Sequence, residues 1–139
     1  MKNRGTLCII KVLLNKYTIE NNINTTNTIN TAENTTSSSS SNSTTLGEQN
    51  ALAQAKNYLS IMAFSYSGLI EQLEYEGYTT EEATYAVDNC GADWYEQAAK
   101  KAEEYLDVMS FSRSGLIEQL EYEGFTTEQA EYGVTAVGY

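Results

Sequence analysis

The sequence contains no histidine and no proline, and it has only two cysteines. Without histidine, the commonest general acid or base and the commonest metal ligand are both missing. Two cysteines are too few for a disulfide scaffold or a four-thiolate zinc site. No apolar run approaches the roughly 18 residues that a membrane-spanning helix needs. We therefore expect no cofactor, no metal site, no transmembrane helix and no enzymatic activity.

Basic residues are also scarce, and their distribution is uneven. The 139 residues include 8 Lys and Arg against 19 Asp and Glu, which gives a net charge of -11. Residues 1–46 have a net charge of +2, whereas residues 47–139 hold four basic and 17 acidic residues, a net charge of -13. A protein that binds nucleic acid through its phosphates needs a basic face. The charge therefore predicts that this protein does not bind DNA.

Residues 1–20 form a leader with some features of an export signal. Basic residues precede an apolar patch from Leu7 to Leu14, but Lys11 interrupts the patch. A secretory signal has an unbroken apolar run of about 7–15 residues and a small-residue cleavage site after it. We interpret the leader as a degraded, truncated or mis-started export signal; a disordered leader without function is the alternative. Cys8 lacks the neighbours that lipid attachment requires, so we expect no lipid there.

Residues 21–46 have the composition of a tether. Of the 25 residues from Asn21 to Thr45, 21 are Asn, Thr or Ser. Such a stretch has too little apolar surface to offset the entropy lost on ordering. Because it also lacks proline, we expect a flexible, disordered linker and not a stiff spacer.

The rest of the chain is an internal repeat. Residues 58–92 align without gaps to residues 105–139 at an offset of 47, and 23 of the 35 positions are identical. Residues 67–77 and 114–124 are identical throughout. A repeat of this size indicates a duplicated structural unit. We place the first repeat at residues 47–92 and the second at residues 93–139.

Each repeat has the pattern of three helices. Helix one is predicted at about 46–62 and 94–109, where Thr45 and Asp93 are placed to cap its start. Helix two follows Ser65 and Ser112, and ends at Gly77 and Gly124. Helix three follows capping boxes that begin at Thr79 and Thr126, and ends at Gly91 and Gly138. The predicted fold is all-α: two tandem, three-helix, helix-turn-helix-like repeats that pack together and share the helix beginning at Trp94.

The expected core consists of large apolar side chains at helical spacing. In the first repeat they are Phe64, Leu69, Ile70, Leu73, Tyr78, Val87 and Trp94, and their counterparts are expected in the second. Cys90 aligns with Val137, so we expect it to be a small core residue with an inert thiol.

An acidic and aromatic face on helix two is the candidate binding site. Ordinary solvated faces mix charges of both signs, but here the charges are all negative, and tyrosine is a favoured interface residue. A basic protein segment is the partner that such a face would attract. An ordinary solvated helix face is the alternative. The candidate residues are Glu71, Glu74, Tyr75 and Glu76, and in the second repeat Glu118, Glu121, Tyr122 and Glu123.

Two other functions, calcium binding and a role as an intracellular adaptor, have weaker support in the sequence. The segment from Asp88 to Asp93 contains acids, Asn and Gly, but it lacks the alternating oxygen ligands and distant Glu of a calcium-binding loop. The segment from Glu76 to Ala83 loosely resembles the Gly-aromatic loop of ubiquitin-associated modules. An intracellular adaptor with three-helix modules is thus an alternative function, although the long first helix argues against it.

The ordered pattern of residues resembles a known family. It runs from Ala51-Leu52 through Phe64-Ser65 and Gly77-Tyr78-Thr79 to Ala92-Asp93-Trp94, and it resembles the Ltp-like helix-turn-helix repeat of host cell surface-exposed lipoproteins. The resemblance covers about Ala51 to Tyr139. It implies a lipoprotein of Gram-positive bacteria and their prophages, with a Ser/Thr-rich tether and two repeats.

The resemblance also implies a function. Phage members of this family act in superinfection exclusion: they block the injection of incoming phage DNA, and an acidic surface engages the phage tape-measure protein. We therefore expect a monomeric, non-enzymatic binding protein that acts at the cell surface if it is exported. A cytoplasmic location stays open because residues 1–20 contain no convincing lipid-attachment signal. A bacterial surface protein of unrelated role is a further alternative.

Overall fold

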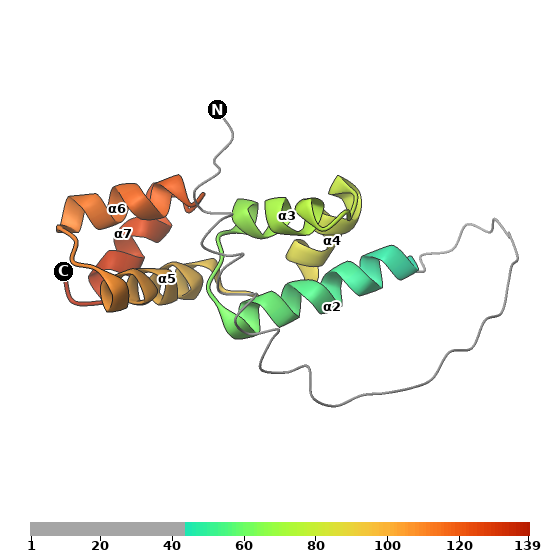
Figure 1. The fold of residues 1–139 in the computed structure, drawn as a ribbon, viewed down its shortest axis with the longest axis horizontal. Coiled ribbons are helices and arrows are strands. Elements are labelled where there is room, and N and C mark those ends of the chain that lie inside the picture. The colour runs from blue at the N-terminus through green and yellow to red at the C-terminus, as the bar shows by residue number, and fades with distance from the viewer. Residues whose placement is uncertain (1–43) are drawn as a thin grey trace, which may run out of the picture. The chain divides into compact units, whose positions relative to one another are not determined.

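The structure is a computed structural model that describes residues 44–139. The predictions for the leader and for nearly all of the tether fall outside these residues. Within residues 44–139 the chain forms six helices and no strand, in two sets of three (Figure 1). The first repeat contains α2 (Leu46–Ile61), α3 (Tyr66–Tyr75) and α4 (Thr80–Asn89), and the second contains α5 (Trp94–Val108), α6 (Arg113–Tyr122) and α7 (Thr127–Ala136). The predicted all-α fold is confirmed.

The helices begin where side chains can bind their first free N–H groups. Thr45 accepts a hydrogen bond from the Glu48 N–H, and the Glu48 carboxylate accepts one in return from the Thr45 N–H. The same reciprocal pair forms at the starts of α4 and α7. Ser65, Asp93 and Ser112 cap the other three helices. Every predicted N-cap is present because capping depends on only four consecutive residues.

Gly124 is required at the turn between α6 and α7 for two reasons. Its φ of 93° lies in the left-handed region that side chains with a Cβ rarely adopt. A Cβ at this position would also overlap the Ser67 hydroxyl of the first repeat. Gly77 has the same conformation in the first repeat, but open space surrounds it. The second turn therefore lies against the first repeat, and the first turn faces no equivalent neighbour.

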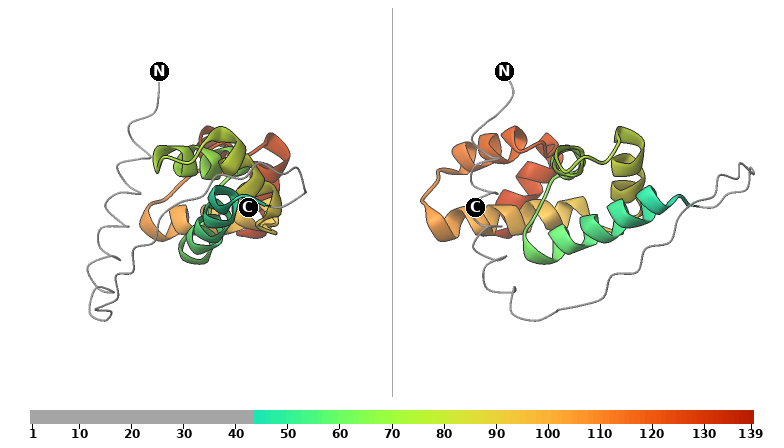
Figure 2. Two further views of the ribbon diagram at one scale, coloured as in Figure 1. Left: turned by 90° about the vertical axis from the view of Figure 1, so that its right-hand side faces the viewer. Right: turned by 45° about the vertical axis from the view of Figure 1, so that its right-hand side comes forward.

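Helix one packs mainly against helix three in each repeat, as the pairs α2–α4 and α5–α7 show in two further views (Figure 2). The contact surfaces carry small residues: Ala51 and Ala55 on α2, and Ala98 and Ala102 on α5, are all fully buried. At Gly133 the backbones approach so closely that a Cβ would lie 2.7 Å from the carbonyl carbon and oxygen of Ala98. Small side chains thus set the spacing of these helix pairs.

The observed core differs in part from the predicted one. Phe64, Leu69, Leu73 and Val87 are buried, as predicted, but Ile70, Tyr78 and Trp94 are only half-buried. In the second repeat, Leu116, Leu120, Phe125 and Val134 are buried, whereas Phe111 and Ile117 are half-buried. A three-helix unit of this size has little interior volume, so some of its larger side chains stay partly exposed. Fully buried alanines on helix one make up the rest of each core.

Cys90 also departs from the prediction of a core position. It is half-buried at the C-cap of α4, where its thiol donates a hydrogen bond to the carbonyl oxygen of Val87 at 3.1 Å. The residue follows the last helical turn, so its side chain lies at the end of the apolar face and not within it.

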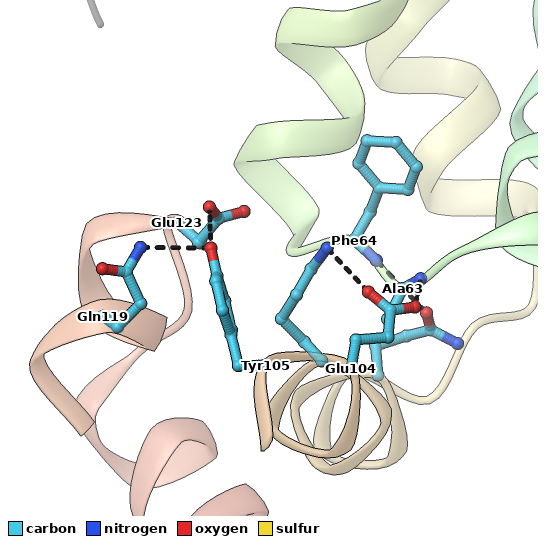
Figure 3. A network of polar contacts seen from close by, with 8 residues as sticks. Ala63, Phe64, Glu104, Tyr105, Gln119 and Glu123 are labelled. Carbon is cyan, nitrogen blue, oxygen red and sulfur yellow. Dashed lines mark hydrogen bonds and ion pairs between the residues drawn. The ribbon is translucent and has the colours of Figure 1, made fainter. Parts of the chain in front are cut away.

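The two repeats meet where α5 faces the segment that leads into α3. The Glu104 carboxylate accepts a hydrogen bond from the Ala63 N–H at 2.8 Å, and the Gln97 side-chain oxygen accepts one from the Phe64 N–H at 3.4 Å (Figure 3). Lys101 forms an ion pair with Glu104 at 3.0 Å and lies 5.9 Å from the centre of the Phe64 ring. The helix that begins at Trp94 therefore belongs to the second repeat but also binds the first, as predicted.

Candidate functional site

The structure places the predicted acidic face at the exposed side of α3 and α6. Glu71 and Glu118 are exposed, as are Tyr75 (52% exposed) and Tyr122 (61% exposed). The two sets come from identical sequences and occupy equivalent positions in their repeats. These four residues thus present their side chains to solvent in matched pairs.

Glu74 and Glu121 are exposed but also have a local role. Each carboxylate accepts a hydrogen bond from a threonine hydroxyl at the start of helix three, Thr80 or Thr127, at 2.6 Å. These bonds join the end of helix two to the start of helix three across the glycine turn. One carboxylate oxygen in each pair stays available to a partner, because the bond uses only Oε1.

Glu76 and Glu123 take part in a polar network between helix two and helix one of each repeat, although Glu76 is exposed and Glu123 is half-buried. In the second repeat the Tyr105 hydroxyl donates to the Glu123 carboxylate at 2.5 Å and accepts from the Gln119 side-chain amide at 3.1 Å (Figure 3). In the first repeat Tyr58 makes the equivalent bonds with Glu76 and Gln72. These glutamates therefore bind helix two to helix one, and the structure gives them a stabilising role that the sequence analysis did not foresee.

Burial shifts the protonation of groups in these networks. Desolvation raises the pKa of Glu76 above its usual range, although hydrogen bonding with Gln54 partly opposes the shift. Desolvation also raises the pKa of Tyr105, and the neighbouring carboxylate of Glu123 raises it further. Tyr105 therefore stays neutral well into the alkaline range and keeps its proton for Glu123.

The sequence contains a signal for these networks. Tyr58, Gln72 and Glu76 recur without change as Tyr105, Gln119 and Glu123 at the offset of 47. The glutamine and glutamate are four residues apart, so they lie on one side of helix two. A tyrosine on helix one that is retained with them indicates a polar contact between the helices.

Acidic side chains in residues 44–139 are nearly all without an ion-pair partner. The part of the chain that the structure describes contains 17 acidic and four basic residues, and a single ion pair, between Lys101 and Glu104. Helix three carries no Lys or Arg in either repeat. The excess of acidic residues produces a negative electrostatic field, which attracts cationic groups and repels phosphates.

Two kinds of site are missing from the described part of the chain. None of its helices combines the length and the apolarity needed to cross a lipid bilayer. Among residues 44–139, no group of three or more Cys, Asp or Glu side chains is placed to hold a metal ion.

Comparisons with known proteins agree with the repeat pattern. The family model described as "Host cell surface-exposed lipoprotein" matches residues 47–90 and again residues 93–137. The chain is also similar to the solved structure of Ltp, a superinfection exclusion protein from the Streptococcus thermophilus temperate phage TP-J34. The two share 34% sequence identity with a TM-score of 0.63, over 67% of this chain and 97% of that one. No curated protein sequence matches the chain at a significant level.

Two matches to one model, each covering one three-helix unit, account for both repeats and for more than half of the chain. The solved relative matches at a level of identity that supports common descent as well as a common fold. The chain therefore belongs to the family of host cell surface-exposed lipoproteins.

Proposed function

We propose that this protein is a non-enzymatic binding protein that excludes superinfecting phage, acting at the cell surface when it is exported. Its family and its similarity to a superinfection exclusion protein support this role. One observation carries the proposed mechanism: both repeats expose glutamates at matched positions, with 17 acidic residues against four basic ones in residues 44–139. Such a surface fits a positively charged segment of another protein.

In the proposed mechanism the protein acts by occupancy. The exposed glutamates and tyrosines of α3 and α6 hold a basic segment of an incoming phage protein, and the held protein can no longer help DNA to enter the cell. The tape-measure protein is the candidate partner that the family resemblance implies. The protein binds as a monomer and does not bind DNA, because its helix-three surfaces carry no Lys or Arg to neutralise phosphates.

Charge reversal on helix two tests the proposed function. The test variant replaces Glu71, Glu74, Glu118 and Glu121 with lysine in the full chain, expressed in a phage-sensitive host. We expect plating of an excluded phage to return to the level of cells without the protein, because the changes replace the attraction with repulsion. Plating efficiency and the surface level of the protein are measured together.

A control variant separates position from net charge. It replaces Glu81, Asp88, Glu128 and Glu131 with lysine; all four are exposed acids on or beside helix three. Its net charge equals that of the test variant, and we expect it to retain exclusion. Exclusion that survives reversal on helix two would contradict the proposal. Equal loss in both variants would show that net charge alone matters and that helix two is not the site.

A further inference from the structure

A groove of about 510 Å³ lies between α5 and α7 in the second repeat. Leu106 and Val137 form part of its apolar lining, and Tyr132 adds an aromatic ring that is 49% exposed. The Tyr132 ring packs edge to face on the Tyr95 ring, with 5.4 Å between the ring centres. Its position is therefore held within the repeat, and an incoming apolar side chain would meet a preformed surface.

Charged side chains also line this groove, on its α5 side. Glu96, Glu103 and Asp107 line the groove together with Lys100, and all four are exposed. They follow one another along one side of α5 at spacings of three or four residues, so they form a row beside the apolar lining. The row has a net charge of -2.

The first repeat provides an internal comparison, because its helices follow the same path. At the offset of 47 the charged row is replaced by Gln49, Ala53, Lys56 and Ser60, which have a net charge of +1. Tyr85 takes the place of Tyr132, but it is half-buried and its hydroxyl shares a hydrogen bond with the Thr44 hydroxyl at 3.2 Å. The acidic row and the open tyrosine are therefore properties of the second repeat alone.

We propose that the groove between α5 and α7 binds an amphipathic, basic protein segment, with an apolar side chain against Leu106, Tyr132 and Val137 and with Lys or Arg side chains along the acidic row. The proposal rests on the proposed function, since it specifies the partner as a basic segment that is also amphipathic. It adds an apolar anchor to the charged faces of α3 and α6. Charge complementarity selects a cationic segment, and the apolar lining selects one with a hydrophobic side.

Two synthetic peptides test this proposal on the full chain. One is a short helical peptide with lysines on one side and leucines on the other, and the second has the same lysines but serines in place of the leucines. We expect the leucine peptide to bind at least about tenfold more tightly at ~150 mM salt, because only its leucines can fill the groove. Titration followed by nuclear magnetic resonance would give both affinities and should show the largest shifts in α5 and α7.

Matched substitutions in the two repeats locate the binding. Tyr132→Ser and Glu103→Lys should each weaken the leucine peptide about fivefold or more. The equivalent changes in the first repeat, Tyr85→Ser and Lys56→Glu, should alter its affinity less than about twofold. Equal affinity for the two peptides, no binding of the leucine peptide, or equal effects of Tyr132→Ser and Tyr85→Ser would overturn the groove proposal.

These outcomes are distinct from those of the plating test. If helix-two reversal abolishes exclusion while both peptides bind equally, the proposed function stands and the groove proposal fails. If exclusion survives helix-two reversal while the leucine peptide binds at α5 and α7, the groove stands and the helix-two site fails.

Discussion

At the scale of single residues, Tyr58 and Tyr105 connect the helices of each repeat. Each hydroxyl donates to a glutamate at the end of helix two and accepts from a glutamine one turn earlier. The bonds to Glu123 and Gln119 are partly buried, and a hydrogen bond to a charged group in such a place contributes more than an ordinary one. These contacts give the small core a fixed arrangement that alanine packing alone would not specify.

Replacing Tyr105 with phenylalanine should destabilise the protein by about 1–2 kcal/mol at pH 7. The change keeps the ring and its edge-to-face contact with Phe111, but it leaves the Glu123 carboxylate without its tyrosine donor. Urea denaturation followed by circular dichroism measures the loss. Tyr122→Phe is the control, because Tyr122 is 61% exposed. Equal stability of the two variants would contradict the role of Tyr105.

The raised pKa of Tyr105 also predicts that the stability of the folded protein falls with pH in the alkaline range. The pKa of Tyr105 is raised in the folded protein above its ordinary value of 10.0. Above that pH the unfolded chain loses the tyrosine proton while the folded chain keeps it, so the folded state binds more protons and its stability falls as pH rises. The contribution of Tyr105 to the free energy of unfolding is fully present at pH values below the ordinary tyrosine pKa of 10.0. In Tyr105→Phe, the decline in the free energy of unfolding above this pH should be shallower.

At the scale of helices, the close approach of α5 and α7 sets the shape of the second repeat. Gly133 allows the α7 backbone to lie against the Ala98 carbonyl. The equivalent residue in the first repeat is Ala86, which is also fully buried. The two helix pairs therefore need not have the same spacing, although the repeats share most of their sequence.

Gly133→Ala should lower the free energy of unfolding by up to about 2 kcal/mol. Alanine is favoured over glycine inside a helix by about 1 kcal/mol, but its Cβ would lie 2.7 Å from the carbonyl carbon and oxygen of Ala98, so one of the two backbones would have to shift. Overpacking of this kind typically costs about 1–3 kcal/mol. Denaturant unfolding gives the value, and Thr135→Ala at an exposed position of the same helix is the control. A stabilised Gly133→Ala variant would show that α7 can shift outward at little cost.

The boundaries of the helices were predictable from sequence because the signals that start and stop a helix are local. Thr45, Thr79 and Thr126 each act within four residues, and the turn glycines act at a single position. The Tyr–Gln–Glu networks were not predicted because they join residues 14 to 18 positions apart on different helices. The groove was missed for the same reason, since its lining comes from α5 and α7 together.

At the scale of the whole molecule, one short segment joins the two repeats. The N–H groups of Ala63 and Phe64 donate to α5, and the Ser65 hydroxyl donates to the carbonyl oxygen of Glu123. Two of these bonds run from backbone N–H groups of the first repeat to side chains of α5, and the third runs from a first-repeat hydroxyl to the turn that follows α6. These directional contacts, together with the edge-to-face packing of Tyr66 on Trp94 at 5.5 Å between ring centres, join the two repeats.

Glu104→Ala should loosen this junction without unfolding either core. The change removes the acceptor for the Ala63 N–H and the partner of Lys101. We expect amide hydrogen exchange at Ala63 to accelerate at least about tenfold, which corresponds to about 1.4 kcal/mol, while core amides of α2 and α4 exchange as before. Glu103→Ala, at the exposed neighbouring position, is the control. Unchanged exchange at Ala63 would show that Glu104 does not hold the repeats together.

The two repeats contribute different groups to the junction between them, and this difference determines how a longer array of such repeats can form. Ser110 and Phe111 take the places of Ala63 and Phe64, so the second repeat still carries the backbone N–H groups that form the donor half of the junction. The other half, Gln97 and Glu104, has no equivalent in α2, where Asn50 and Asn57 stand instead. A third unit copied from residues 93–139 and appended to the array would bring its own matching partners, whereas one copied from residues 46–92 would not. Growth of the array by duplication is thus favoured from one end only.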